Sequence, residues 1–156
     1  MLYSGLRVSE VVKLEIWDIS ILERSWFVNI RSSKGGKTRK VPLSLNVREI
    51  LTQYIKEYYE NSGNLKSSYS WKMFYGQRWI LTEIGVNKMI EKYSLYSQVK
   101  VTPHLLRHTF SYNYLGINKS DIVWLSQILW HGSIETTAIY TQNRLEDLQE
   151  RVEGMC

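Results

Sequence analysis

The sequence has 156 residues, 44% of them hydrophobic, and 20 Lys and Arg against 15 Asp and Glu, for a net charge of +5. This length suits one globular domain with a hydrophobic core and leaves no room for a second full domain. Charged residues interrupt every stretch of about 18 residues, which argues against a membrane span, and the single cysteine, Cys156, excludes an internal disulfide. We expect a protein of the reducing cell interior with no membrane partner.

The first half of the chain predicts a small sheet between two helices. Apolar spacing favours a short helix over residues 8–15 and a longer one over 46–60. Between them lie three runs rich in β-forming residues and separated by polar turns: Ile19–Leu22, Trp26–Ile30 and Lys40–Leu43. We expect these runs to form an antiparallel sheet.

The second half predicts helices joined by short loops. Residues 61–68 are polar and indicate a loop, after which Thr82 is suited to cap a helix over 83–95. Further helices are expected over 103–115, where Pro103 fits the first position, from Ser120 through Leu129, from Ser133 to Tyr140, and over 144–153. The fold class expected is α+β, mainly helical with a small three-stranded antiparallel sheet.

A basic cluster lies where the sheet is expected to turn. Residues 31–40 contain no acidic residue but hold five basic ones: Arg31, Lys34, Lys37, Arg39 and Lys40. Such a cluster attracts polyanions, and double-stranded DNA is the simplest partner. A solvated basic hairpin without a partner explains the same pattern.

Three segments carry a more specific pattern. They are Gly5-Leu-Arg-Val-Ser-Glu10, Pro103-His-Leu-Leu-Arg-His-Thr-Phe110 and Leu129-Trp-His-Gly-Ser-Ile-Glu-Thr-Thr-Ala-Ile-Tyr140. Together they resemble the catalytic core of the tyrosine recombinases, the phage integrase family. The resemblance covers nearly the whole chain and implies that family's catalytic fold.

The resemblance assigns a role to each matched residue. It implies a catalytic set of Arg7, Lys34, His104, Arg107, His131 and Tyr140, supported by Glu10 and His108. Lys37 is close enough to Lys34 to be confused with it, and it joins Arg31, Arg39 and Lys40 as an expected DNA contact. The family usually has glycine where this chain has Trp130.

The chemistry of these residue types agrees with those roles. A tyrosine hydroxyl with a pKa of about 10 costs roughly 4 kcal/mol to ionise at neutral pH, so it needs a base or a fixed positive charge. Arg7 and Arg107 suit the nonbridging oxygens of a phosphodiester under attack. His104 can accept the phenolic proton, His131 can bind the phosphate, and Lys34 can protonate the leaving 5′ oxygen.

This scheme requires no metal and no cofactor. A covalent 3′-phosphotyrosine keeps the energy of the broken strand, so a DNA 5′-hydroxyl can reseal it without ATP. His104 and His108 stand four residues apart, a spacing that zinc pairs also use. With no cysteine nearby and no glutamate between them, we expect no metal there.

The resemblance implies a site-specific recombinase that acts on DNA inside the host cell, in association with the nucleoid. An integrase of a virus, plasmid or other mobile element is the expected role, and the chromosomal dimer-resolution recombinases share the same motifs. We expect other protomers to assemble on DNA, with a tetramer as the active complex. The alternatives are a type IB topoisomerase and a non-catalytic DNA-binding regulator of the same fold. We expect residues 1–143 to form the catalytic domain without its usual first helix, and 144–156 to form a tail helix.

Overall fold

The structure is a computed structural model, and it describes residues 1–21, 25–31, 38–61, 71–76, 79–117 and 121–129. The chain divides into two compact units, Met1–Phe110 and Ser111–Cys156. Each unit is described by itself.

The first unit begins with helix α1 (Val8–Val11) and the 3₁₀ helix η1 (Ile16–Asp18). The prediction of a helix over residues 8–15 was too long, because α1 ends after about one turn. Beyond α1, the backbone pairs with a distant segment instead. The Met73 N–H donates to the Leu14 carbonyl at 2.8 Å, and the Ile16 N–H donates to the Trp71 carbonyl at 2.9 Å.

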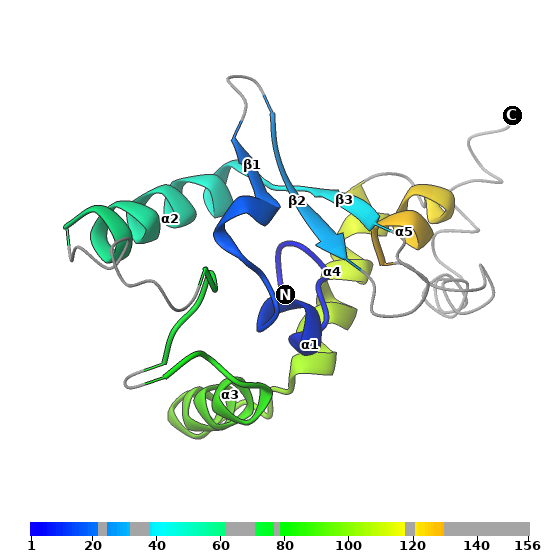
Figure 1. Cartoon of the computed structure of the whole chain (residues 1–156). Coiled ribbons are helices and arrows are strands. Elements are labelled where there is room, and N and C mark those ends of the chain that lie inside the picture. Colours follow the sequence, from blue (N-terminus) through cyan, green and yellow to red (C-terminus); the bar gives the residue numbers. More distant parts are fainter. Residues whose placement is uncertain (22–24, 32–37, 62–70, 77–78, 118–120, 130–156) are drawn as a thin grey trace, which may run out of the picture. The chain divides into compact units, whose positions relative to one another are not determined.

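The predicted antiparallel sheet is confirmed, with the strand order β1-β2-β3 (Figure 1). Its strands are β1 (Ile19–Ile21), β2 (Trp26–Arg31) and β3 (Thr38–Pro42). Val28 lies opposite Val41, and both are almost fully buried. Cross-strand pairs of β-branched residues stabilise a sheet by packing together on one face.

Strand β3 has a strict alternation of exposed and buried residues. Arg39 and Val41 are buried, whereas Thr38, Lys40 and Pro42 are exposed. Successive side chains of a strand point to opposite faces, so the two adjacent basic residues of β3 have different surroundings. This alternation decides which of them can meet the solvent.

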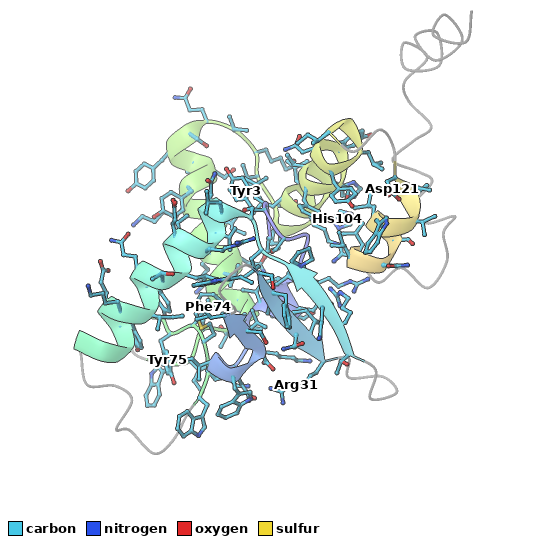
Figure 2. The ribbon with its side chains drawn as sticks, turned by 90° about the horizontal axis from the view of Figure 1, so that it is seen from above. Tyr3, Arg31, Phe74, Tyr75, His104 and Asp121 are labelled. Atoms are coloured by element: carbon cyan, nitrogen blue, oxygen red, sulfur yellow. The ribbon has the colours of Figure 1, made fainter. Side chains whose placement is uncertain are left out.

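Helix α2 (Leu45–Ile55) follows the sheet and continues as η2 (Lys56–Asn61), a stretch of π-helix. It is the helix predicted over residues 46–60. Aromatic rings join it to residues 71–76. Tyr54 contacts Phe74 at 5.6 Å between ring centroids, and Tyr58 stacks on Tyr75 at 5.2 Å; Phe74 and Tyr75 are labelled in Figure 2.

Helices α3 (Glu83–Ser97) and α4 (Pro103–Ile117) confirm two further predictions. Thr82 caps α3, because its hydroxyl accepts a hydrogen bond from the Gly85 N–H at 3.1 Å. Helix α3 ends at Gln98, whose φ of 56° is left-handed. Helix α1 contacts α3.

The core of the first unit is made by the inner face of the sheet and the elements around it. Its buried hydrophobic residues are Leu6, Leu14, Val28, Ile30, Val41, Leu43, Met73, Val86 and Ile90. An apolar cavity of about 420 Å³ opens among the N-terminal residues, the sheet, α2 and α3. Of the charged residues predicted for the catalytic site, the two that the structure describes, Arg7 and Arg107, do not line this cavity.

In the second unit, the structure describes the C-terminal half of α4 and helix α5 (Ile122–Leu129). Leu125, Ile128 and Leu129 are buried, as their spacing predicts. The helices predicted over 133–140 and 144–153 lie outside the described residues. Among the residues that the structure describes, no helix has both the length and the apolar character needed to cross a membrane.

Candidate active site

The candidate site begins at a turn before α1. Gly5 has a φ of 63°, a left-handed conformation that glycine adopts at little cost. Two residues later, Arg7 occupies the N-cap position of α1, and its backbone N–H donates to Glu10 Oε2 at 2.8 Å. The motif Gly-Leu-Arg thus supplies both the turn and the first arginine, and Glu10 ties that arginine to the helix.

The Glu10 carboxylate is the centre of the site. Arg7 Nη1 donates to Glu10 Oε1 at 3.3 Å, and Arg107 Nη1 lies 4.0 Å from Oε2. A third guanidinium, that of Arg39, binds both oxygens at 2.8 Å. One carboxylate therefore gathers three arginines that are far apart in the sequence, and the cluster keeps an excess of positive charge.

Arg107 comes from α4 and is held from two directions. Its Nη1 donates to the Gly5 carbonyl at 2.6 Å and faces Glu10. The Arg107 side chain is only 6% exposed, whereas that of Arg7 is 45% exposed. Arg107 is thus fixed inside the unit, while Arg7 faces solvent.

The electrostatics favour an ionised Glu10. Burial by itself raises the pKa of the Glu10 carboxyl, but the hydrogen bonds from Arg39 and from the Arg7 backbone, with the charges of both arginines, bring that pKa below its ordinary value of 4.5. Glu10 is therefore a carboxylate at neutral pH. As a carboxylate it can hold the guanidiniums in place.

Two histidines pair on α4, one turn apart. The Nε2 atoms of His104 and His108 are 2.6 Å apart, and the rings meet edge to face. Because a neutral imidazole has one N–H, one of these nitrogens must donate and the other accept. Burial, His104 and Arg107 lower the pKa of His108 from 6.5, so His108 stays neutral near pH 7.

The structure gives two residues of the basic cluster a different environment from the one predicted. Arg39 was expected to contact DNA, but its side chain is buried and bound to Glu10. Arg31 bonds to Asp18 at 2.6 and 3.0 Å and to Glu15 at 2.7 Å, so two acids balance its charge. Arg31 and His104 also lie well apart in Figure 2.

Lys40 keeps the exposed position that DNA contact requires. It lies on the face of β3 opposite to Arg39, with its Nζ 4.6 Å from the centre of the Phe27 ring. Lys34, Lys37, His131 and Tyr140 lie outside the described residues. Their roles stay predictions from the sequence.

The described residues contain no group of three or more His, Cys, Asp or Glu side chains placed to hold a metal ion. The His104–His108 pair by itself supplies two nitrogen atoms as possible metal ligands. What the described site offers chemically is an anion-binding cluster: two arginines fixed by one carboxylate, with an imidazole pair on the same helix as Arg107. Such a cluster suits a phosphate that gains negative charge.

Known proteins match this chain along nearly its whole length. A sequence model of the Phage integrase family matches residues 1–146. The chain is 34% identical over 152 residues to the tyrosine recombinase XerA of Pyrococcus furiosus, covering 96% of this chain and 50% of that protein. The chain spans about half the length of the curated relatives it matches.

Two solved structures share the fold. The crystal structure of XerA recombinase matches with a TM-score of 0.78 at 31% identity, covering 99% of this chain and 54% of that one. The XerH site-specific recombinase, solved with its palindromic difH substrate in a post-cleavage complex, matches with a TM-score of 0.77 at 23% identity. That match covers 97% of this chain and 42% of the XerH chain.

Proposed function

Because the chain belongs to the phage integrase family, in which its relatives are tyrosine recombinases, we propose that it is a site-specific DNA recombinase. It cleaves one strand of double-stranded DNA and rejoins it through a covalent 3′-phosphotyrosyl intermediate at Tyr140. The observation that carries the proposal is the Glu10 carboxylate, which joins Arg7 and Arg107 across a hundred residues of sequence.

The two arginines bind the scissile phosphate. When an oxygen attacks phosphorus, negative charge accumulates on the nonbridging oxygens, and fixed guanidiniums stabilise that charge without reorganising. Arg7 offers an exposed guanidinium that Glu10 already orients. Arg107 adds a second charge from a buried position that the Gly5 carbonyl defines.

The proton movements balance within the side chains of the site. The Tyr140 oxygen bonds to phosphorus and its proton passes to His104, while the bond from phosphorus to the 5′ oxygen breaks. Lys34 gives a proton to that oxygen, which leaves as a 5′-hydroxyl. The reverse sequence, with a 5′-hydroxyl from a second DNA, reseals the strand. Each step therefore conserves the number of high-energy bonds and needs no ATP.

His108 supports the base by fixing the tautomer of His104. If His104 donates from Nε2 to a neutral His108, the other ring nitrogen of His104, Nδ1, is unprotonated and can accept the phenolic proton. The lowered pKa of His108 keeps it neutral and able to accept. His131 completes the set by donating a hydrogen bond to the phosphate.

The proposed partners are double-stranded DNA and further protomers. Another structure of this fold, the Tn1549 transposon integrase, was solved in complex with transposon right end DNA, which supports DNA as the ligand. Exchange of strands between two DNA duplexes requires one active site for each strand end, so we propose a tetramer as the active complex. DNA of the cell interior is the substrate, and Lys40 lies on the exposed face where a phosphate contact is possible.

A suicide substrate tests this proposal. A nick placed beside the cleavage site lets a short fragment diffuse away after cleavage, so the covalent complex cannot reverse. We expect the intact chain to form a protein–DNA adduct stable to denaturant, and Tyr140→Phe to form none. Equal DNA binding by both proteins without an adduct would contradict the proposal and favour a DNA-binding regulator.

A second assay separates strand exchange from relaxation. We expect the chain to join strands from two different duplexes that carry its recognition site. Relaxation of supercoiled plasmid without any joining of partners would instead indicate a type IB topoisomerase.

A further inference from the structure

Arg39 is a buried arginine of the site whose burial argues against the expected DNA contact, and the chemistry above gives it no other role. It lies on β3, opposite Ile30 of β2, with its side chain on the buried face of the sheet. Burying a guanidinium is unfavourable unless it is paired and hydrogen-bonded. Its position next to Arg7 and Arg107 therefore needs an explanation.

The guanidinium of Arg39 binds Glu10 more closely than those of Arg7 and Arg107 do. Arg39 makes the two short parallel bonds, from Nη1 to Oε1 and from Nη2 to Oε2, both at 2.8 Å. The guanidiniums of the two site arginines are farther from the same oxygens, at 3.3 Å for Arg7 and 4.0 Å for Arg107. A bidentate fork fixes the plane of a carboxylate as well as its position.

This arrangement of contacts determines how much positive charge Arg7 and Arg107 present to a phosphate. Without Arg39, the half-buried Glu10 carboxylate would draw its hydrogen bonds from Arg7 and Arg107. The N–H groups of these two arginines would then point away from an incoming anion. With Arg39 bound, the Glu10 charge is already balanced by a residue that faces the interior. Glu10 can then orient the two site arginines and leave most of their charge for the phosphate.

We propose that Arg39 is a positioning residue for strand cleavage, which acts through Glu10 on Arg7 and Arg107. This inference rests on the proposed recombinase function, since it concerns the same phosphate site. Arg39 touches no reacting atom in this scheme. Its role is to set the orientation and the effective charge of the residues that do.

The test compares Arg39→Met and Arg39→Lys with the wild-type chain. Lysine keeps the positive charge but cannot form the bidentate fork to a carboxylate. Arg39→Lys therefore tests the same contact if Arg39→Met fails to fold. The matched control is Arg48→Met, which removes the same charge and a single bond to the Leu43 carbonyl at 2.9 Å on α2, away from Glu10. The folded fraction of each variant is measured by urea unfolding.

Single-turnover cleavage of the nicked substrate is the first readout. We expect Arg39→Met to lower the cleavage rate at saturating DNA by about 10- to 100-fold, the range found for residues that orient the ligands of metal sites and so act in the same indirect way. DNA affinity should change less than threefold. Arg48→Met should cleave at the wild-type rate. A rate for Arg39→Met that equals this control after correction for the folded fraction would overturn the proposal.

Cleavage of a substrate with a methylphosphonate at the scissile position is the second readout. If Arg39 had a purely structural role, the defect of Arg39→Met would be the same on this substrate as on the phosphate. Replacing one charged oxygen by methyl reduces the negative charge that the arginines must stabilise. We expect the defect of Arg39→Met relative to wild type to shrink at least tenfold on this substrate. An unchanged defect would contradict a role through the arginines.

A 5′-bridging sulfur is the third readout, because it leaves without protonation and so bypasses Lys34. Arg39 stands five residues after Lys34 in the sequence, so an indirect effect through the lysine must be separated. We expect this substrate to restore Lys34→Ala but not Arg39→Met, and restoration of both would refute the route through Glu10. A wild-type chain that forms no adduct would instead refute the recombinase function itself.

Discussion

Replacing Glu10 by glutamine tests whether one carboxylate holds the site together. The change keeps the shape of the side chain but removes its charge. Glutamine can still accept from one Nη of Arg39, whereas its amide N–H₂ faces the other Nη, where a bond of 2.8 Å is lost. A hydrogen bond to a charged group contributes about 1.5–3 kcal/mol, and a buried guanidinium left half-paired adds to the loss.

These terms predict that Glu10→Gln lowers the free energy of unfolding by about 2–4 kcal/mol at pH 7. The Arg39 and Glu10 side chains are only 8% and 14% exposed, so solvent screens this pair little. The matched control is Glu49→Gln on the exposed side of α2, which should change stability by less than about 0.5 kcal/mol. Urea unfolding followed by tryptophan fluorescence measures both variants.

The difference in unfolding free energy between wild type and Glu10→Gln depends on pH in a definite direction. The pKa of Glu10 is lowered in the folded state, so its stabilising effect is complete above the ordinary value of 4.5 and is lost as the pH falls through the folded-state pKa. Wild type and Glu10→Gln should therefore converge in acid. A difference in unfolding free energy that is small at pH 7, or that stays constant down to acid pH, would contradict the stabilising role of the Glu10 carboxylate.

Three further predictions concern the turns and the histidine pair. Gly5→Ala should destabilise the chain by about 1–2 kcal/mol and slow cleavage, because φ is 63° there and the Gly5 carbonyl positions Arg107; unfolding and adduct formation check it. Gln98→Gly should stabilise by about 0.5 kcal/mol in urea, because glycine adopts the left-handed end of α3 more easily. His108→Gln should remove the loss of stability that wild type shows as the pH falls below 6.5, because the lowered pKa of His108 opposes its protonation in the folded state; parallel pH profiles would contradict this.

The order of helices and strands could be predicted because it depends on local patterns. Apolar spacing defined α2, Thr82 marked the start of α3, and the short runs of β-forming residues defined the sheet. The end of α1 could not be predicted in this way. It depends on hydrogen bonds to residues 71–73, which no local pattern contains.

The sequence could name candidate residues for the site but not the contacts between them. Spacing and resemblance pointed to Arg7, Glu10 and Arg107, and the structure brings these three together. Arg39 was misassigned, because a run of basic residues indicates a surface patch. The signal was present nonetheless: Arg39 stands two residues before the buried Val41, so the period of a strand places both on the inner face.

Arg31 shows the complementary limit. Its sequence neighbours are basic, yet its charge is balanced by Asp18 and Glu15, more than ten residues away. Net charge within a sequence window therefore overstated the potential that this part of the surface presents. Only the fold reveals which acids face which bases.

The most direct measurement is the identity of the residue that becomes linked to DNA. Protein trapped on the nicked substrate is digested with protease and nuclease, and the modified peptide is sequenced by mass spectrometry. We expect a nucleotide attached through a 3′-phosphate to the Tyr140 oxygen, with the adduct lost in Arg7→Ala and Arg107→Ala. An adduct on any other side chain, or one that forms equally well without these arginines, would contradict it.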